Sequence, residues 1–165
     1  MSTIHVLLAS NPAIWRDELA AYMAESANIE VSGTCAAGPE TVLLADAIRP
    51  DILIVDAVPE DREAMESLIR TIKIRQPAVK IIALSACEDR GHILHFLDAG
   101  VDGYISRARA SAELVRAVET VASGQAFLCP TASLALIDGY RSRAHQLHKR
   151  VTSRRTPDGG IEGRV

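Results

Sequence analysis

Short runs of apolar residues alternate along the chain with longer segments in which apolar positions recur every three or four residues. The short runs predict strands, and runs that are apolar on both faces predict strands buried in a parallel sheet. We expect five strands, at residues 4–9, 29–36, 51–56, 79–84 and 101–106. The periodic segments predict helices, at residues 12–26, 39–49, 62–76, 88–98 and 111–123.

This alternation of strand and helix restricts the topology. Right-handed crossovers between parallel strands place helices on both faces of a single sheet. The sequence therefore predicts an α/β fold, a doubly wound five-stranded parallel sheet that occupies residues 1–124. A joint and a helical linker are expected at 125–150, with the helix over 131–147. Residues 151–165 are expected to form a disordered basic tail.

The run from Asp51 to Asp56 is the best candidate for the centre of the sheet, because four apolar residues stand uninterrupted between two aspartates. Ligands and chemistry gather outside the carboxyl ends of the strands in an open parallel sheet. Asp56 stands at that end of its strand, which makes it the first candidate functional residue. The alternative is an aspartate that only ends the strand in a turn.

Composition limits the class of protein. The chain has 165 residues, of which 48% are hydrophobic and 24% charged, as expected for one globular domain with a core. No apolar run reaches the length of a membrane span and no signal peptide is recognisable, so we expect a cytoplasmic protein without a membrane partner. The three cysteines (Cys35, Cys87, Cys129) are expected to be reduced and structural.

Charge is distributed unevenly. Residues 1–140 carry 11 Lys and Arg against 19 Asp and Glu, whereas residues 141–165 carry 7 against 2. An acidic domain is therefore followed by a basic tail. The histidine pairs His92/His95 and His145/His148 have helical spacing, but neither has a nearby cluster of carboxylates or thiolates to complete a site, so no metal site is predicted there.

Five segments, in order, resemble the receiver domain of bacterial response regulators, and most closely that of the NarL/LuxR class. The resemblance implies a CheY-like, flavodoxin-like sheet with strand order 2-1-3-4-5, and a role in two-component phosphorelay signalling and transcription regulation. The segments are Val6-Leu7-Leu8 with Asn11-Pro12, Arg49-Pro50-Asp51-Ile52-Leu53-Ile54-Val55-Asp56, Ile81-Ile82-Ala83-Leu84-Ser85-Ala86, Ala99-Gly100-Val101-Asp102-Gly103-Tyr104-Ile105 and Gly124-Gln125-Ala126-Phe127-Leu128-Cys129-Pro130.

The resemblance implies that Asp56 occupies the position that a histidine kinase phosphorylates in this family. Ser85 matches the hydroxyl residue after the fourth strand, and Tyr104 matches the aromatic residue that reports the switch. The family also uses two acidic residues after the first strand to hold Mg²⁺, and a lysine after the fifth strand. This chain has Ala9 and Ser10 in place of the acidic pair and Arg107 in place of the lysine. In addition, Pro59 comes one residue earlier than in the family pattern.

These departures change the expected chemistry. Mg²⁺ prefers carboxylate oxygens and neutralises the phosphoryl group as it approaches the aspartate. Ala9 offers no ligand atom and Ser10 only a neutral one, so we expect weak or absent Mg²⁺ binding. Arg107 is permanently charged and long enough to pair directly with Asp56. The alternative is that Arg107 points into solvent and Asp56 accepts only backbone hydrogen bonds.

Three functions follow from these residues. The first is an atypical receiver, a signalling module rather than an enzyme, which acts through protein contacts or dimerisation without Mg²⁺-dependent phosphorylation. The second is a conventional response regulator whose Asp56 accepts phosphate, upstream of a missing helix-turn-helix DNA-binding domain. The third is a flavodoxin-like enzyme or cofactor binder, which is disfavoured because no glycine-rich loop follows the first strand.

The expected partners are a second copy of the chain and a histidine kinase or other signalling protein. The segments around His92–His95 and Leu114–Val118 are candidate dimer faces. The basic stretch is expected to bind DNA weakly and without sequence preference, the alternative being a solvated linker; its residues are Arg141, Arg143, Lys149, Arg150, Arg154 and Arg155, with His145 and His148 between. Ile161-Glu162-Gly163-Arg164 resembles an engineered protease site, so these last residues are not assigned to the natural protein.

Overall fold

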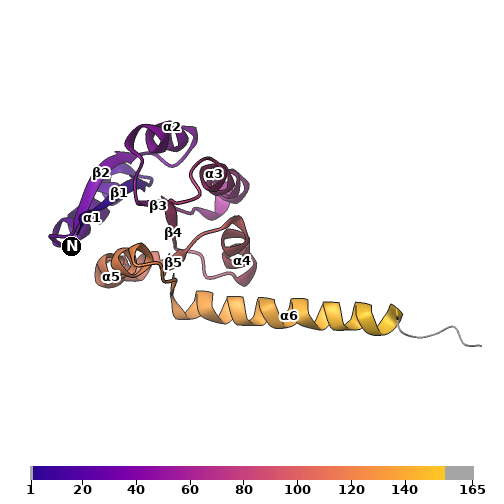
Figure 1. The fold of residues 1–165 in the computed structure, drawn as a ribbon. Helices are drawn as coiled ribbons and strands as arrows, with labels where there is room; N and C mark the ends of the chain where they lie inside the picture. The colour runs from indigo at the N-terminus through magenta and orange to yellow at the C-terminus, as the bar shows by residue number, and fades with distance from the viewer. Residues whose placement is uncertain (1, 155–165) are drawn as a thin grey trace, which may run out of the picture.

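The apolar runs form the strands of one parallel sheet in the computed structural model, which describes residues 2–154 (Figure 1). The strand order is β2-β1-β3-β4-β5-β6, and every neighbouring pair is parallel. The predicted order of the first five strands is confirmed. The strands are β1 (Ile4–Ala9), β2 (Ile29–Cys35), β3 (Ile52–Asp56), β4 (Lys80–Ser85), β5 (Gly103–Ser106) and β6 (Phe127–Leu128).

The prediction of five strands was short by one. Phe127 and Leu128, which we expected to form an irregular joint, pair with Gly103 and Tyr104 of β5 and extend the sheet at its edge. A two-residue edge strand leaves almost no periodic signal in a sequence.

Helices cover both faces of the sheet, as predicted. One face carries α1 (Ala13–Ala24) and α5 (Ala110–Ala122), and the other carries α2 (Pro39–Ile48), α3 (Arg62–Arg75) and α4 (Arg90–Ala99) (Figure 1). Two short 3-10 helices, η1 (Pro59–Asp61) and η2 (Arg107–Arg109), precede α3 and α5. The two hydrophobic layers meet at β3, whose residues are all buried. This position explains the uninterrupted apolar run of β3, because a strand that is covered on both sides has no polar face.

Different residues mark the ends of the helices. Pro12 precedes α1, and Ser111 lies inside α5. Asp89 caps α4 by accepting a hydrogen bond from the backbone N–H of His92, so this helix begins two residues after Glu88. Gly100 follows the end of α4, with a φ of 111° that residues with a side chain rarely adopt.

The C-terminal helix α6 (Pro130–Arg154) is longer than expected and extends well beyond the sheet (Figure 1). Residues 151–154, which were assigned to a disordered tail, continue this helix, and the rest of that tail lies outside the described residues. The first half of α6 packs against α4. Gly139 allows this approach, because a Cβ there would lie 2.8 Å from a side-chain methyl carbon of Leu94.

Two ion pairs fasten α6 to α4. Arg143 donates to both carboxylate oxygens of Asp98, and Arg90 pairs with Asp138 at 2.8 Å. Every residue from 141 to 154 is nevertheless exposed, so the second half of α6 makes no core. None of the helices within residues 2–154 is both long and apolar enough to cross a membrane.

Candidate functional site

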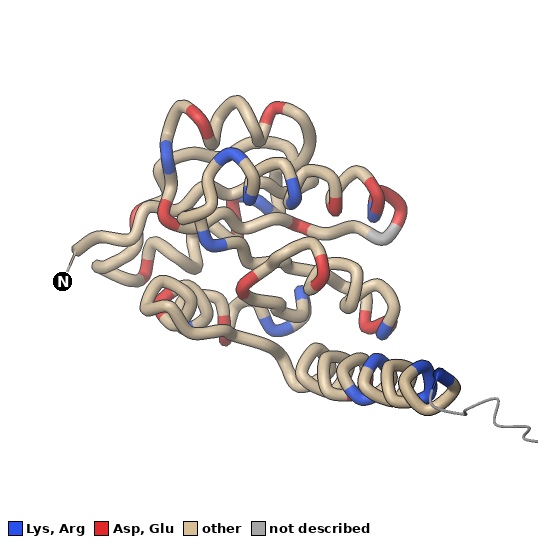
Figure 2. The backbone as a smooth tube through the Cα atoms, turned by 45° about the vertical axis from the view of Figure 1, so that its right-hand side comes forward, with Lys and Arg blue, Asp and Glu red and all other residues tan. Residues whose placement is uncertain are grey.

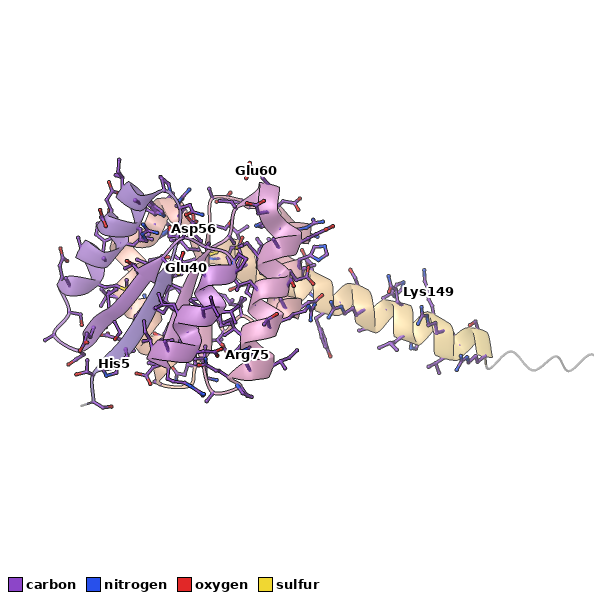
Figure 3. The ribbon with its side chains drawn as sticks, turned by 90° about the horizontal axis from the view of Figure 1, so that it is seen from above. His5, Glu40, Asp56, Glu60, Arg75 and Lys149 are labelled. Atoms are coloured by element: carbon purple, nitrogen blue, oxygen red, sulfur yellow. The ribbon has the colours of Figure 1, made fainter. Side chains whose placement is uncertain are left out.

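Asp56 ends β3 at the carboxyl edge of the sheet, where the topology predicts chemistry. Figure 3 shows it at the opposite end of the sheet from His5, which lies near the start of β1. Its side chain is only 2% exposed. Ala9 and Ser10, at the end of the neighbouring strand β1, are fully buried beside it, and the Ser10 hydroxyl donates a hydrogen bond of 3.0 Å to Asp56 Oδ2.

Arg107 supplies the positive charge of the site. It follows β5, and because β5 and β3 end at the same edge of the sheet, its side chain reaches back to Asp56. The distance from Arg107 Nη2 to Asp56 Oδ2 is 2.5 Å, and the same nitrogen donates to the backbone oxygen of Asn11 at 3.0 Å. The structure thus brings together the two residues that the sequence suggested as a pair.

Trp15 completes the surroundings of Arg107 and was missed as a site residue. The guanidinium carbon of Arg107 lies 4.9 Å from the centre of the Trp15 ring, which is a cation–π distance. The Trp15 ring covers one side of the guanidinium, and the Arg107 side chain as a whole has an exposed fraction of 28%. Arg107 is therefore held at three points, by a carboxylate, a backbone oxygen and an aromatic face. No sequence motif indicated Trp15, because α1 only brings it to this loop in the folded chain.

The electrostatics of Asp56 are dominated by burial. Burial raises the pKa of this carboxyl above its ordinary value, and the Arg107 charge, the Ser10 hydroxyl and the backbone of Asn11 offset that rise only in part. Holding the ionised carboxylate inside the fold therefore carries a net cost. Arg107 reduces that cost, and removing it would expose the full desolvation penalty.

The residues around Asp56 do not fit a Mg²⁺ ion. Such an ion takes about six oxygen ligands, usually including one or two carboxylates. Of the residues Ala9, Ser10 and Asp56, only Asp56 has a carboxylate. The Ser10 hydroxyl donates its proton in a hydrogen bond to Asp56, and the Ala9 side chain has no polar atom. Arg107 already pairs with Asp56 Oδ2, an oxygen that a metal ion would need as a ligand. Within the described part of the chain, no group of three His, Cys, Asp or Glu residues could hold a metal ion.

Ser85 ends β4, next to β3 in the sheet, but its hydroxyl is engaged away from Asp56. The Oγ atom accepts a hydrogen bond of 3.0 Å from the backbone N–H of Cys87 and lies 3.4 Å from His92 Nε2. His92 is buried in α4, and burial lowers the pKa of its imidazole, so the ring is neutral at neutral pH. This contact with Ser85 was not foreseen, since the sequence suggested His92 only as part of a candidate dimer face and no metal site was predicted for the pair His92/His95.

Tyr104, in β5, is buried with its ring inside the fold. Its hydroxyl donates a hydrogen bond of 3.1 Å to the backbone oxygen of Cys87, and burial raises its pKa to about 12. Tyr104 and Ser85 therefore both hold the backbone of the loop between β4 and α4. His95 instead faces Glu66 of α3, at 3.4 Å. The three cysteines are free thiols, with Cys35 and Cys129 buried and Cys87 half-buried.

Comparison with known proteins decides the family. The model of the response regulator receiver domain matches residues 6–119, more than half of the chain. The chain belongs to this family. The chain is 28% identical to the response regulator protein VraR of Staphylococcus aureus over 152 residues, a match that covers 92% of this chain and 72% of VraR.

Solved structures share the fold. A two-component response regulator of the LuxR family from Aurantimonas sp. SI85-9A1 matches with a TM-score of 0.76 and 22% identity, over 84% of this chain and 99% of that one. A structure described as two RcsB dimers bound to two parallel DNAs matches with a TM-score of 0.71 and 20% identity, over 82% and 68% of the respective chains. The family match and the shared fold together identify a response regulator receiver domain.

Proposed function

We propose that this receiver domain is an atypical one, which acts in two-component-type signalling and transcription regulation without Mg²⁺-dependent phosphorylation of Asp56. The contact between Arg107 and Asp56 carries this proposal, because the guanidinium of Arg107 already binds the carboxylate oxygen that a metal ion would otherwise bind. The domain is proposed to work as a signalling module through protein contacts, rather than as an enzyme.

Phosphoryl transfer to an aspartate brings a doubly negative group up to a carboxylate, and catalysis of that step consists mainly of positioning and charge neutralisation. Asp56 Oδ2 already accepts from Ser10 and Arg107. A phosphoryl group would have to displace Arg107 from three partners, with no carboxylate pair to recruit a metal in its place. This reasoning supports slow or negligible phosphorylation.

A phosphorylation assay tests the proposal. The protein is incubated with acetyl phosphate and Mg²⁺ and examined by intact-mass spectrometry, and we expect no stoichiometric phosphate adduct. The triple variant Ala9→Asp, Ser10→Asp, Arg107→Lys restores the family's charged set and is expected to gain an adduct. Asp56→Ala in each background identifies the acceptor. An adduct on the unmodified protein that disappears in Asp56→Ala would show a conventional phospho-accepting regulator.

The proposed partners are a second copy of the chain and a histidine kinase or another signalling protein. The description of RcsB dimers on DNA supports dimerisation, since that protein shares the fold. The faces suggested around Leu114–Val118 are unsuitable, because Leu114 and Val118 are fully buried against the sheet. His92 is buried as well, which leaves only His95 exposed in the other suggested face.

Direct DNA binding by the basic end of the chain is proposed to be weak and without sequence preference, so that specific binding requires a further domain or a partner. The basic residues up to Arg154 lie along α6, on a single exposed helix, and Arg155 lies outside the described residues (Figure 2). Contact of these residues with phosphates would be salt-dependent. A gel-shift titration at low and at physiological salt checks this. Sequence-selective binding that survives physiological salt would contradict it.

A further inference from the structure

An exposed apolar stripe runs along α6 from Ile137 to Val151. Ile137, Tyr140, Ala144, Leu147 and Val151 follow one another at intervals of three and four residues, which places them on one side of the helix. The four large side chains are between 47% and 73% exposed. The side of α6 that contacts α4 is a different one, since it carries Gly139 and Arg143.

Positive charges border this stripe on both edges. On a helical projection, Arg141 and His148 follow one edge, and Arg143 and Arg150 follow the other. Residues 141–154 contain no Asp or Glu at all. Pairing of two α6 helices along their stripes would bring like charges together at the flanking positions, which determine partner choice in helix pairs. The stripe therefore suits an apolar surface with an acidic border, and not a second α6.

Such a surface is present on the same chain, between α2 and α3. A shallow groove of about 300 Å³ lies there, with the side chains of Val42, Met65 and Leu68 in its lining. Glu40 lies in the first turn of α2, Glu63 lies in the first turn of α3, and Glu60 lies in η1, which precedes α3. All three acids are exposed, and none forms an ion pair within the described residues.

The groove of one copy cannot be filled by its own α6. Figure 3 shows α2 and α3 side by side with Glu40 and Glu60 labelled, whereas Lys149 lies far from both on the projecting helix. The helix is continuous from Pro130 to Arg154 and is fastened to α4 by two ion pairs, so it does not fold back. The occupant must come from another molecule.

We propose that the apolar stripe of α6 docks into the α2–α3 groove of a second copy of this chain. The Arg and His residues along the stripe then face Glu40, Glu60 and Glu63 of that copy. In a two-fold dimer the contact is made twice, because each copy gives one helix and one groove. The inference deepens the protein-contact part of the proposed function and rests on it.

Charge reversal on the two surfaces tests the docking. Arg141→Glu with Arg150→Glu changes both edges of the stripe, and Glu40→Arg with Glu63→Arg changes the groove. None of these four residues has an ion-pair partner within residues 2–154. In sedimentation equilibrium of the full chain, each double variant should raise the dimer dissociation constant roughly tenfold or more. The quadruple variant, with the charges exchanged, should recover the dimer. Leu147→Ser should also weaken it.

Ser142→Glu with Gln146→Glu is the matched control, since it adds negative charge on the other side of α6 and should leave the dimer intact. A monomer at all concentrations would overturn the proposal, as would a dimer that ignores the groove variants. Binding of the helix to phosphatidylglycerol vesicles or to DNA in place of dimerisation would overturn it too. Acetyl phosphate treatment of the monomeric variants separates the two claims, because resistance to phosphorylation should persist when the dimer is lost.

Discussion

Replacing Arg107 by Gln should destabilise the domain mainly through the charge left behind on Asp56. The variant loses the 2.5 Å contact with a carboxylate that is 2% exposed, together with the stack on Trp15. Removing one partner of a fully buried pair costs about 3–5 kcal/mol. Because Arg107 is 28% exposed and Ser10 still donates to Asp56, we expect a loss of about 2–3 kcal/mol at neutral pH.

The pH dependence of this loss identifies its cause. Without Arg107 the folded-state pKa of Asp56 rises further, so the contribution of the ion pair is present above that pKa and disappears as the pH falls and the carboxyl is protonated. Urea unfolding followed by far-ultraviolet circular dichroism, at neutral and at acid pH, measures it. Circular dichroism is preferable to fluorescence because Trp15 itself contacts Arg107.

Arg70→Gln is the matched control, since Arg70 forms an exposed pair with Glu66 one helical turn away on α3. Its loss should be about 0.3–0.5 kcal/mol. The reasoning fails if Arg107→Gln costs no more than this control, or if its cost is the same in acid. Either result would mean that the contact with Asp56 contributes little and that Arg107 acts only through packing.

Three further predictions concern neighbouring groups. Asp56→Asn should raise the thermal midpoint at neutral pH. The pKa of Asp56 is higher in the folded than in the unfolded state, so the protein loses stability as the pH rises through the folded-state pKa, and Asn avoids this loss. The gain in thermal midpoint should vanish in acid. Ala9→Asp with Ser10→Asp should lower the midpoint in chelator and recover it in Mg²⁺, because three close carboxylates then share one site; equal midpoints would contradict this. His92→Gln should reduce the decline in stability below pH ~6.5, because the pKa of the His92 imidazole is lowered in the folded state and protonation of the ring therefore favours unfolding. Unfolding curves measured across this pH range test the prediction.

The fold was predictable because its main signals are strong. Buried parallel strands such as β3 are continuous apolar runs, and strand–helix alternation leaves few topologies. Family resemblance then assigned the functional positions, and the common edge of β3 and β5 explains why Arg107 could be expected near Asp56. What failed were features set by tertiary packing. Leu114 and Val118 have the right spacing for a helical face, but spacing does not say whether a face meets the sheet or a partner.

The contacts of Trp15 and His92 show a second limit of sequence reasoning. Trp15 is distant in sequence from Arg107, whereas His92 is only seven residues from Ser85, but each interaction depends on how its helix is placed against the sheet. No local pattern encodes such a pairing. The extension of α6 beyond residue 147 is not explained by its ion pairs with α4, because these involve Asp138 and Arg143, within the predicted helix.

Arg107 and the loop between β4 and α4 are both held by side-chain contacts. The charge on Arg107 is already satisfied by Asp56. Ser85 and Tyr104 both bind the backbone of Cys87 in that loop, and Ser85 also contacts His92 of α4. From α4 the contacts continue to α6 through Asp98 and Arg143. The proposed docking of α6 therefore engages a helix that is joined to the same α4 that contacts this loop.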